Sequence, residues 1–292
     1  MLLFGSVAVI VMKKIGILYH PEKETTYALA RQLEEFLGAK HLPVWLCSAW
    51  EDEVARAQVN GTDLIVSIGG DGTILRAAQV VIPGLIPIIG INLGRLGFMT
   101  ELNVDETKEK LDAFLDGEGW IDERSLLEAE FSPSGEEPGS SRTFYVLNDV
   151  VVARGAVARV IYVEARINDE PLTTYKADGV IVATATGSTG YSLSAGGPIL
   201  DPRAKEFLLL PILPHLSPAY TMVLPSTAVV ELSITIPSTP PATLSIDGHI
   251  NLPLSDGAVI RVRHSSNTVR FLRIHPKASF YNSLEQKLKG KQ

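Results

Sequence analysis

The sequence has a single cysteine and no excess of basic residues, and both shortages exclude classes of function. Cys47 alone forms neither an internal disulfide nor a thiolate zinc site, and its apolar surroundings favour a buried small side chain over a nucleophile. The six histidines show no HExxH spacing, so they predict no histidine–cysteine metal site. The net charge of −7 argues against a nucleic-acid partner or an anionic membrane surface, since both need a basic face.

Long apolar runs are also lacking. Residues 2–11 are too few to cross a bilayer, and they have neither the basic leader nor the small-residue cleavage site of a signal peptide. We therefore expect residues 1–11 to lie outside a fold that starts near Met12, in a cytoplasmic protein with no membrane partner. The chain of 292 residues is 46% hydrophobic and 20% charged, which is typical of a globular protein with about two domains.

The first part of the chain alternates short apolar runs with helical patterns. The runs at 14–20, 42–47, 63–69 and 86–92 predict buried strands, and helices are predicted between and after them. Strands that alternate with helices indicate a parallel sheet, so we expect a Rossmann-like α/β domain over residues 12–120.

From about Ile121 the pattern changes to short β-branched segments separated by turns such as "NDE", "PSG" and "SDG". This pattern predicts an all-β sandwich domain over residues 121–280. The last segment, residues 281–292, reads as a helix that returns to the first domain.

The stretch "SIGGDGTILRA", residues 67–77, joins a predicted strand to a predicted helix through glycines. Such a turn lies at the carboxyl edge of a parallel sheet, where its backbone amides and the helix N-terminus bind phosphate. It is neither GxxxxGK[ST] nor GxGxxG. The carboxylate of Asp71 fits a magnesium ion or the acceptance of a proton from an attacking hydroxyl, and the alternative is an ordinary helix N-cap.

Two further segments carry polar groups. Residues 178–200, "DGVIVATATGSTGYSLSAGGPIL", form a backbone-open stretch suited to wrapping a nucleotide, and they do not match the GxSxG elbow of a hydrolase. Asn148 and Asp149 place an amide beside an acid, which suits the two hydroxyls of a ribose, although the pair by itself is equally well an ordinary turn.

In this order, the motifs "GGDGTILRA", "NLGRLGFMTE", "LNDVVVARG" and "DGVIVATATGSTGYSLSAGGPI" resemble the NAD kinase family, from about Lys14 to Leu288. The resemblance implies an α/β domain, a β-sandwich, and a homo-oligomer (dimer or tetramer) that holds NAD between subunits or domains. It implies transfer of the γ-phosphoryl group of ATP, or of polyphosphate, to the adenosine ribose 2′-hydroxyl of NAD. Mg²⁺ or another divalent metal is the implied cofactor.

The resemblance also implies residue roles. Asp71 is the implied proton acceptor, and Asn148 with Asp149 the implied ligands of the nicotinamide-side ribose. Departures from the family pattern include Asp149, where glutamate is common, and Ala185, where proline is usual. The residues implied to contact NAD are Asp71, Gly72, Phe98, Asn148, Asp149, Lys176, Asp178, Thr186, Thr189, Gly190, Tyr191, Ser194 and Asp247. Those implied to contact the phosphates of ATP are Gly69, Gly70, Gly72, Thr73 and Arg76, and no metal ligand is assigned.

Two other functions share parts of this pattern. Lipid kinases contain a "GGDGT" turn, but that turn is typically followed by glutamate, where this chain has "ILRAA", and a pI of 5.4 does not favour a membrane face. A non-catalytic NAD sensor would keep the dinucleotide site but would have no need of Asp71 as a base.

Overall fold

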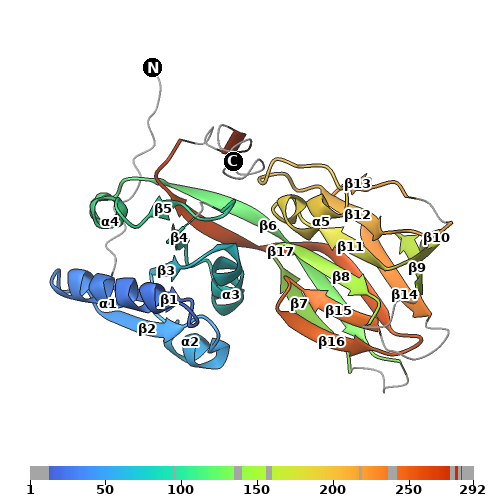
Figure 1. Cartoon of the computed structure of the whole chain (residues 1–292), viewed down its shortest axis with the longest axis horizontal. Helices are drawn as coiled ribbons and strands as arrows, with labels where there is room; N and C mark the ends of the chain where they lie inside the picture. The colour runs from blue at the N-terminus through green and yellow to red at the C-terminus, as the bar shows by residue number, and fades with distance from the viewer. Residues whose placement is uncertain are drawn as a thin grey trace. The chain divides into compact units, whose positions relative to one another are not determined.

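The computed structural model describes residues 13–94, 97–134, 140–155, 160–216, 219–235 and 242–276, together with residues 280, 281 and 284. The chain separates into two compact units, residues 1–123 with 269–292, and residues 124–268. Figure 1 labels their elements. Two strands, β6 (Trp120–Ser132) and β17 (Val259–Arg273), have residues in both units. Residues 1–11, which we expect outside the fold, are not among the described residues.

The first unit is a parallel sheet with helices on both faces, which confirms the predicted α/β fold. Its central strands are ordered β2–β1–β3–β4, and both β5 and Phe271 of β17 pair in parallel with β4. These strands are β1 (Ile15–Tyr19), β2 (Val44–Ser48), β3 (Leu64–Ile68), β4 (Ile88–Asn92) and β5 (Leu102–Asn103). The helices are α1 (Glu24–Gly38), α2 (Asp52–Gln58), α3 (Asp71–Val81) and α4 (Thr107–Leu115), of which the sequence pattern did not predict α2.

Helical periodicity decides which faces of the helices are buried. In α1, Leu29, Leu33 and Leu37 recur at three- to four-residue spacing and pack with Leu111 and Phe114 of α4 in one core. Helix α3 packs on the sheet face that contains Gly90, where a β-carbon would lie 2.4 Å from Ile74 Cδ1 and 3.1 Å from the Cα of Thr100. Glycine in β4 therefore lets α3 and the segment before β5 approach the sheet closely.

The second unit is a β-sandwich, as predicted. One layer pairs β10 (Glu170–Ala177), β9 (Ile161–Ile167), β14 (Val229–Thr235) and β17, and β6 pairs with β17 and β7 (Arg142–Val146). The second layer is antiparallel, in the order β13–β12–β11–β8–β15–β16. Its strands are β8 (Asp149–Ala153), β11 (Gly179–Ala183), β12 (Phe207–Ile212), β13 (Met222–Leu224), β15 (Ala242–Ile246) and β16 (Ile250–Leu254).

Alternation along the strands of the second layer buries both of its faces. Val150 and Val152 of β8 belong to the core between the layers, whereas Val151 packs with Ile181 of β11 in a smaller cluster on the other face. This smaller cluster includes Ala195, which directly follows the short helix α5 (Tyr191–Ser194), and thereby holds the glycine-rich segment against the sheet.

The end of β17 differs from the expectation. The sequence pattern assigned "TVRFLRI" to the all-β part, but Val269–Arg273 cluster with the first unit, because Phe271 pairs with Ile88 and Leu272 joins the first core. The predicted C-terminal helix at residues 281–292 lies almost entirely outside the described residues.

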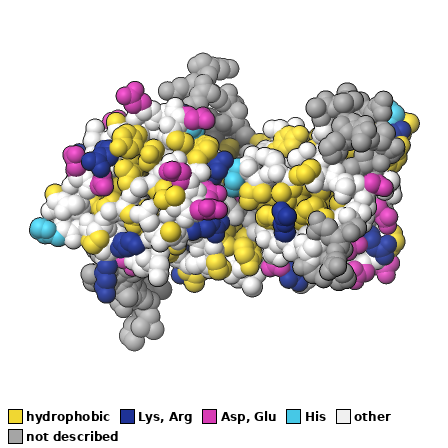
Figure 2. Space-filling view, turned by 90° about the horizontal axis from the view of Figure 1, so that it is seen from below, with side chains coloured by type: hydrophobic (Ala, Val, Ile, Leu, Met, Phe, Trp, Pro, Cys, Tyr) yellow, Lys and Arg dark blue, Asp and Glu magenta, His cyan; other side chains and the backbone are white. Residues whose placement is uncertain are grey.

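Cys47 is buried, as predicted, and burial together with the neighbouring Glu51 raises the pKa of its thiol to about 11, which disfavours the nucleophilic thiolate. Within the described part of the chain, no helix is both long and apolar enough to cross a membrane. On the face drawn in Figure 2, basic and acidic side chains are interspersed among apolar and neutral ones.

Candidate active site

The glycine turn follows β3 and ends where α3 begins at Asp71. Gly69 is needed for close packing, because a β-carbon there would lie 2.2 Å from Thr73 Oγ1. At Gly70 and Gly72 a β-carbon would meet no atom within 4 Å, so the backbone on this side of the turn is open. One side of the turn thus packs against α3, and the other side exposes backbone without side chains at the N-terminus of the helix. Such an arrangement binds phosphate.

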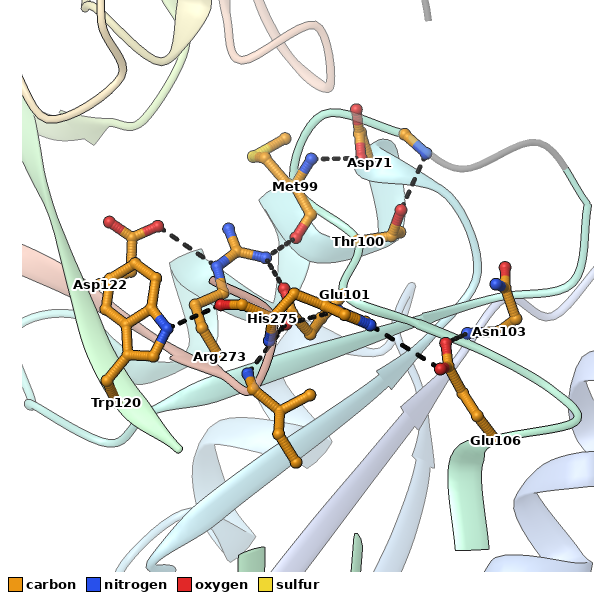
Figure 3. A network of polar contacts seen from close by, with 12 residues as sticks. Asp71, Met99, Thr100, Glu101, Asn103, Glu106, Trp120, Asp122, Arg273 and His275 are labelled. Atoms are coloured by element: carbon orange, nitrogen blue, oxygen red, sulfur yellow. Dashed lines mark hydrogen bonds and ion pairs between the residues drawn. The ribbon is translucent and has the colours of Figure 1, made fainter. Parts of the chain in front are cut away.

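The carboxylate of Asp71 is held by a second backbone segment. Its Oδ2 accepts the N–H of Phe98 at 2.8 Å. Its Oδ1 accepts the N–H of Met99 at 3.1 Å, the contact drawn in Figure 3. Gly97 lies against the same carboxylate, since a β-carbon at that residue would be 2.2 Å from Oδ1. These contacts fix the orientation of the carboxylate.

The helix-cap interpretation of Asp71 is wrong. The N-cap position of α3 is Gly70, and Asp71 is the first residue of the helix. Its carboxylate accepts hydrogen bonds from the N–H groups of Phe98 and Met99, and α3 has no side-chain cap hydrogen bond. A side chain aimed away from its own helix serves another purpose than capping.

The remaining residues predicted for this region have varied environments. Thr73 is buried at 1% exposure with its hydroxyl against Gly69, so it does not face the open side of the turn. The guanidinium of Arg76 lies 4.3 Å from the ring centre of Trp50, and the ring of His20 is tilted by 54° against the same side chain, with 4.5 Å between ring centres. Phe98 is half-buried, with its ring centre 6.5 Å from that of Phe280.

In the second unit, Asn148 and Asp149 begin β8 and are anchored by Asp247. The Asp247 carboxylate accepts the backbone N–H groups of Leu147 at 3.0 Å, Asn148 at 2.7 Å and Asp149 at 3.2 Å. Burial raises the pKa of Asp247, and the three N–H donors oppose that shift. Asp247 is 4% exposed, so in this structure it holds the backbone of the pair instead of facing outward to a ligand.

The side chains of the pair are polar and largely enclosed. Within the described part of the chain, Asn148 Oδ1 is buried without a hydrogen-bond partner, and Asp149 is 5% exposed. Burial, and secondarily the charge of Asp247, raises the pKa of Asp149 to about 7. A buried amide oxygen without a partner is costly, and beside an acid with a raised pKa it marks a candidate ligand site.

The glycine-rich segment that follows β11 packs directly on this pair. A β-carbon at Gly187 would lie 2.1 Å from the carbonyl oxygen of Asn148, and one at Gly190 would lie 3.5 Å from Asn148 Nδ2 and 3.8 Å from Asp149 Oδ2. Thr184 connects the two segments: its N–H donates to the Asn148 carbonyl at 2.8 Å, and its hydroxyl accepts the N–H of Gly187 at 2.9 Å. The structure therefore brings Asn148, Asp149 and Gly190 together.

The other residues predicted on this segment lie around the same turn. Thr189 Oγ1 donates to the carbonyl of Thr186 at 3.2 Å, and the Thr186 hydroxyl accepts a hydrogen bond from Arg124 at 3.3 Å. Tyr191 is 48% exposed and Ser194 is exposed, so both side chains are open to a ligand.

Lys176 lies in β10, and Asp178 lies between β10 and β11. Lys176 Nζ lies 6.0 Å from the ring centre of Tyr162, and the carboxylate of Asp178 forms an ion pair with Arg154 at 2.9 Å.

Sequence reasoning missed three residues of these sites. Gly97 matters because it has no side chain, and Met99 because of its backbone N–H. Neither feature can be recognised from the residue type, although both residues lie inside the motif "NLGRLGFMTE". Arg124 is 5% exposed, and a buried arginine is rare enough to be notable, but its position in a strand pattern gave no sign of its contact with Thr186.

Comparison with known proteins matches both parts of the chain. Residues 45–119 match the model of the ATP-NAD kinase N-terminal domain, and residues 147–274 match that of the ATP-NAD kinase C-terminal domain. An NAD kinase of Dehalococcoides mccartyi is 50% identical over 95% of this chain and 96% of its own length. One from Chloroflexus aggregans is 38% identical over 95% of this chain and 99% of its own length.

Solved structures agree. An NAD kinase from Archaeoglobus fulgidus in complex with ATP superposes with a TM-score of 0.74 at 26% identity, covering 95% of this chain and all of that one. Yeast NADH kinase complexed with NADH shares the fold, with a TM-score of 0.82 at 24% identity over 96% of this chain and 89% of that one. With the glycine turn, its fixed aspartate and the enclosed Asn148–Asp149 pair, these matches decide against the lipid-kinase alternative: the chain belongs to the NAD kinase family.

Proposed function

We propose that this NAD kinase transfers the γ-phosphoryl group of ATP to the 2′-hydroxyl of the adenosine ribose of NAD, with Asp71 as the proton acceptor. The observation that carries the proposal is the carboxylate of Asp71, which is fixed by the N–H groups of Phe98 and Met99 beside an open glycine turn. The Archaeoglobus fulgidus relative was solved with ATP, which supports ATP as the donor.

The reaction balances with one protein base. The 2′-oxygen forms a bond to the γ-phosphorus as the bond from that phosphorus to the β,γ-bridging oxygen breaks, and ADP leaves. The hydroxyl proton passes to Asp71. Each carboxylate oxygen of Asp71 accepts one backbone N–H, so lone pairs remain to take up that proton.

The enclosed pair in the second unit is proposed to bind a ribose of NAD. The unpaired Asn148 Oδ1 and the Asp149 carboxylate can both accept hydrogen bonds, and the two hydroxyls of a ribose both donate them. A ligand that satisfies these groups removes the cost of enclosing them unpaired, which contributes directly to affinity. Tyr191 and Ser194 are proposed to contact the same dinucleotide.

A divalent metal such as Mg²⁺ fits the turn as an ion carried largely by the triphosphate. Among the described residues, no three histidine, cysteine, aspartate or glutamate side chains gather into a metal site. Mg²⁺ commonly uses one or two carboxylates together with substrate phosphates, and Asp71 is the carboxylate that the turn offers. The ion would supply neutralisation of the phosphoryl charge. The homo-oligomer and the cytoplasmic location remain predictions, and light scattering of the purified protein would determine the oligomer size.

The test compares NADP formation by the wild type and by Asp71→Asn, which keeps the shape and removes the charge. Loss of a proton acceptor predicts a fall in kcat of ~10²–10⁴-fold while calorimetry still detects NAD binding. Asp105→Asn, at an exposed residue, is the matched control and should keep wild-type kcat. Near-normal turnover of Asp71→Asn contradicts the assignment, and lost turnover with lost Mg²⁺ binding reassigns Asp71 to the metal.

A further inference from the structure

A buried ion-pair network lies behind the backbone segment that holds Asp71. Arg273, near the end of β17, is 7% exposed in its side chain and pairs with two carboxylates, Glu101 at 3.1 Å and Asp122 at 3.2 Å, which are similarly buried. Figure 3 shows the guanidinium between these two acids and Met99. All of these residues belong to the first unit.

Arg273 reaches the Asp71 region through one hydrogen bond. Its Nη1 donates to the carbonyl oxygen of Met99 at 2.8 Å, while the N–H of the same residue donates to Asp71 Oδ1 at 3.1 Å. The guanidinium and the carboxylate thus bind the two successive peptide groups that meet at the Cα of Met99. A charge-assisted bond to a carbonyl is among the stronger hydrogen bonds, so it anchors the backbone directly after the N–H that binds Asp71.

The rest of the network fixes Arg273 itself. Nε donates to Asp122 Oδ2 and Nη1 donates to Glu101 Oε2. Two nitrogens of the planar guanidinium are therefore bound to carboxylates, which fixes its orientation. Glu101 is anchored in turn, because its Oε1 accepts the backbone N–H groups of Ile274 at 2.9 Å and His275 at 2.8 Å. Its own N–H donates to the carbonyl of Gly90 in β4 at 2.8 Å, which connects the network to the sheet.

We propose that Arg273 is a positioning residue for the reaction: it holds the Phe98–Met99 amides in the place where they orient the carboxylate of Asp71. This inference rests on the proposed role of Asp71 as the base. Arg273 touches neither substrate in this scheme, and it acts only through Met99. A purely structural ion pair would stabilise the first unit and would leave kcat of the folded enzyme unchanged. Experiments can therefore separate a positioning role from a structural one.

The principal test is a double-mutant cycle with Arg273→Lys, which keeps the positive charge and removes the planar guanidinium group. A displacement of catalytic groups by about 1 Å costs on the order of 10²-fold in rate, so we expect kcat to fall by about 10- to 100-fold. The KM values for NAD and ATP should stay within about twofold. In an Asp71→Asn background the same substitution should change kcat by less than about twofold, because the group that it positions is already disabled.

Arg270→Gln is the control. Arg270 lies on the same strand and pairs with Glu123 at 3.2 Å, but both side chains are exposed by more than a third, so kcat should be unchanged. If Arg273→Lys does not fold, Asp122→Asn gives the second measurement. It weakens the hydrogen bond between Arg273 Nε and residue 122 and leaves the charge of Arg273 in place. A smaller loss of kcat that again disappears in the Asp71→Asn background is then expected.

A direct readout accompanies the kinetics. The backbone amide resonances of Phe98 and Met99 should shift in Arg273→Lys and remain in place in Arg270→Gln. An equal loss of kcat in both backgrounds, an unchanged kcat in the folded variant, or unmoved amide resonances would overturn the inference. If Asp71→Asn itself turns over normally, the assignment of the base fails, and the amide resonances then decide separately whether Arg273 holds this segment.

Discussion

Gly97 and Asp71 are in direct contact: a β-carbon on residue 97 would stand 2.2 Å from Oδ1 of Asp71. Gly97→Ala should therefore displace the carboxylate and lower kcat by about 10- to 100-fold, because misplaced catalytic groups lose rate steeply. Steady-state NADP formation measures the effect. Gly38→Ala is the matched control, since a β-carbon there meets no atom within 4 Å and glycine-to-alanine exchange in a helix stabilises. An unimpaired Gly97→Ala enzyme would mean that the close contact has no part in turnover.

Asn148→Ala should weaken the binding of NAD and leave that of ATP nearly unchanged. Its Oδ1 is buried and unpaired in the described structure, which fits a hydrogen bond to a substrate hydroxyl. Loss of a hydrogen bond between neutral groups costs roughly 0.5–1.5 kcal/mol, so the KM for NAD should rise about 2- to 10-fold. Initial rates with each substrate varied in turn measure both constants, with the exposed Asn60→Ala as control. Equal changes in both KM values would indicate a structural turn.

The affinity for NAD should increase with pH across neutrality. Burial and the charge of Asp247 raise the pKa of Asp149 to about 7, so the carboxylate form, which accepts hydrogen bonds from the ribose, becomes dominant only above that pH. Between pH 6 and pH 8 the charged fraction grows about tenfold, and the Kd of NAD should fall by a similar factor. Calorimetry at several pH values tests this. Asp149→Asn should give a nearly flat profile, and an equally steep profile in that variant would assign the dependence to another group.

The same acid should reduce stability at alkaline pH. The pKa of Asp149 is raised from 3.8 to about 7 in the folded protein, so between these values the folded state binds a proton that the unfolded state has released. Stability therefore falls as pH rises through this window and remains reduced above it. Asp149→Asn removes the titration and should raise the free energy of unfolding by about 2–4 kcal/mol at pH 8, and by much less at pH 5. Thermal unfolding at the two pH values measures the difference, and an equal gain at both would contradict the buried-charge explanation.

Asp247→Asn tests whether the buried aspartate organises the Asn148–Asp149 pair. The carboxylate accepts three successive backbone N–H groups, and asparagine offers one carbonyl oxygen and an amide that repels those donors. The variant should lose about 1–3 kcal/mol of stability and bind NAD more weakly, with kcat at saturating NAD close to the wild type. Denaturant unfolding and calorimetry measure the two effects, and a large loss of kcat alone would place Asp247 nearer to the chemistry.

The sequence by itself determined the two kinds of fold and the position of the glycine turn. The runs at β1, β3 and β4 are mostly apolar because parallel strands are covered on both faces, and this pattern can be recognised locally in the sequence. The turn at Gly69–Gly72 was predictable because a strand, glycines and a helix follow one another in the chain. Helix α2, of seven residues, was missed because so short a segment carries little periodicity.

Only the tertiary structure decided what holds the reactive groups. Phe98 lies 27 residues beyond Asp71, Arg273 lies 174 residues beyond Met99, and Asp247 lies 98 to 100 residues beyond the amides that it binds. These contacts depend on backbone N–H and C=O groups. Every residue except proline has both groups, so the residue type does not predict such contacts. Strand pairing and helix packing bring those groups within hydrogen-bonding distance. The assignment of β17 residues to the first unit arises in the same way, from a pairing between Phe271 and Ile88 that the chain sequence does not display.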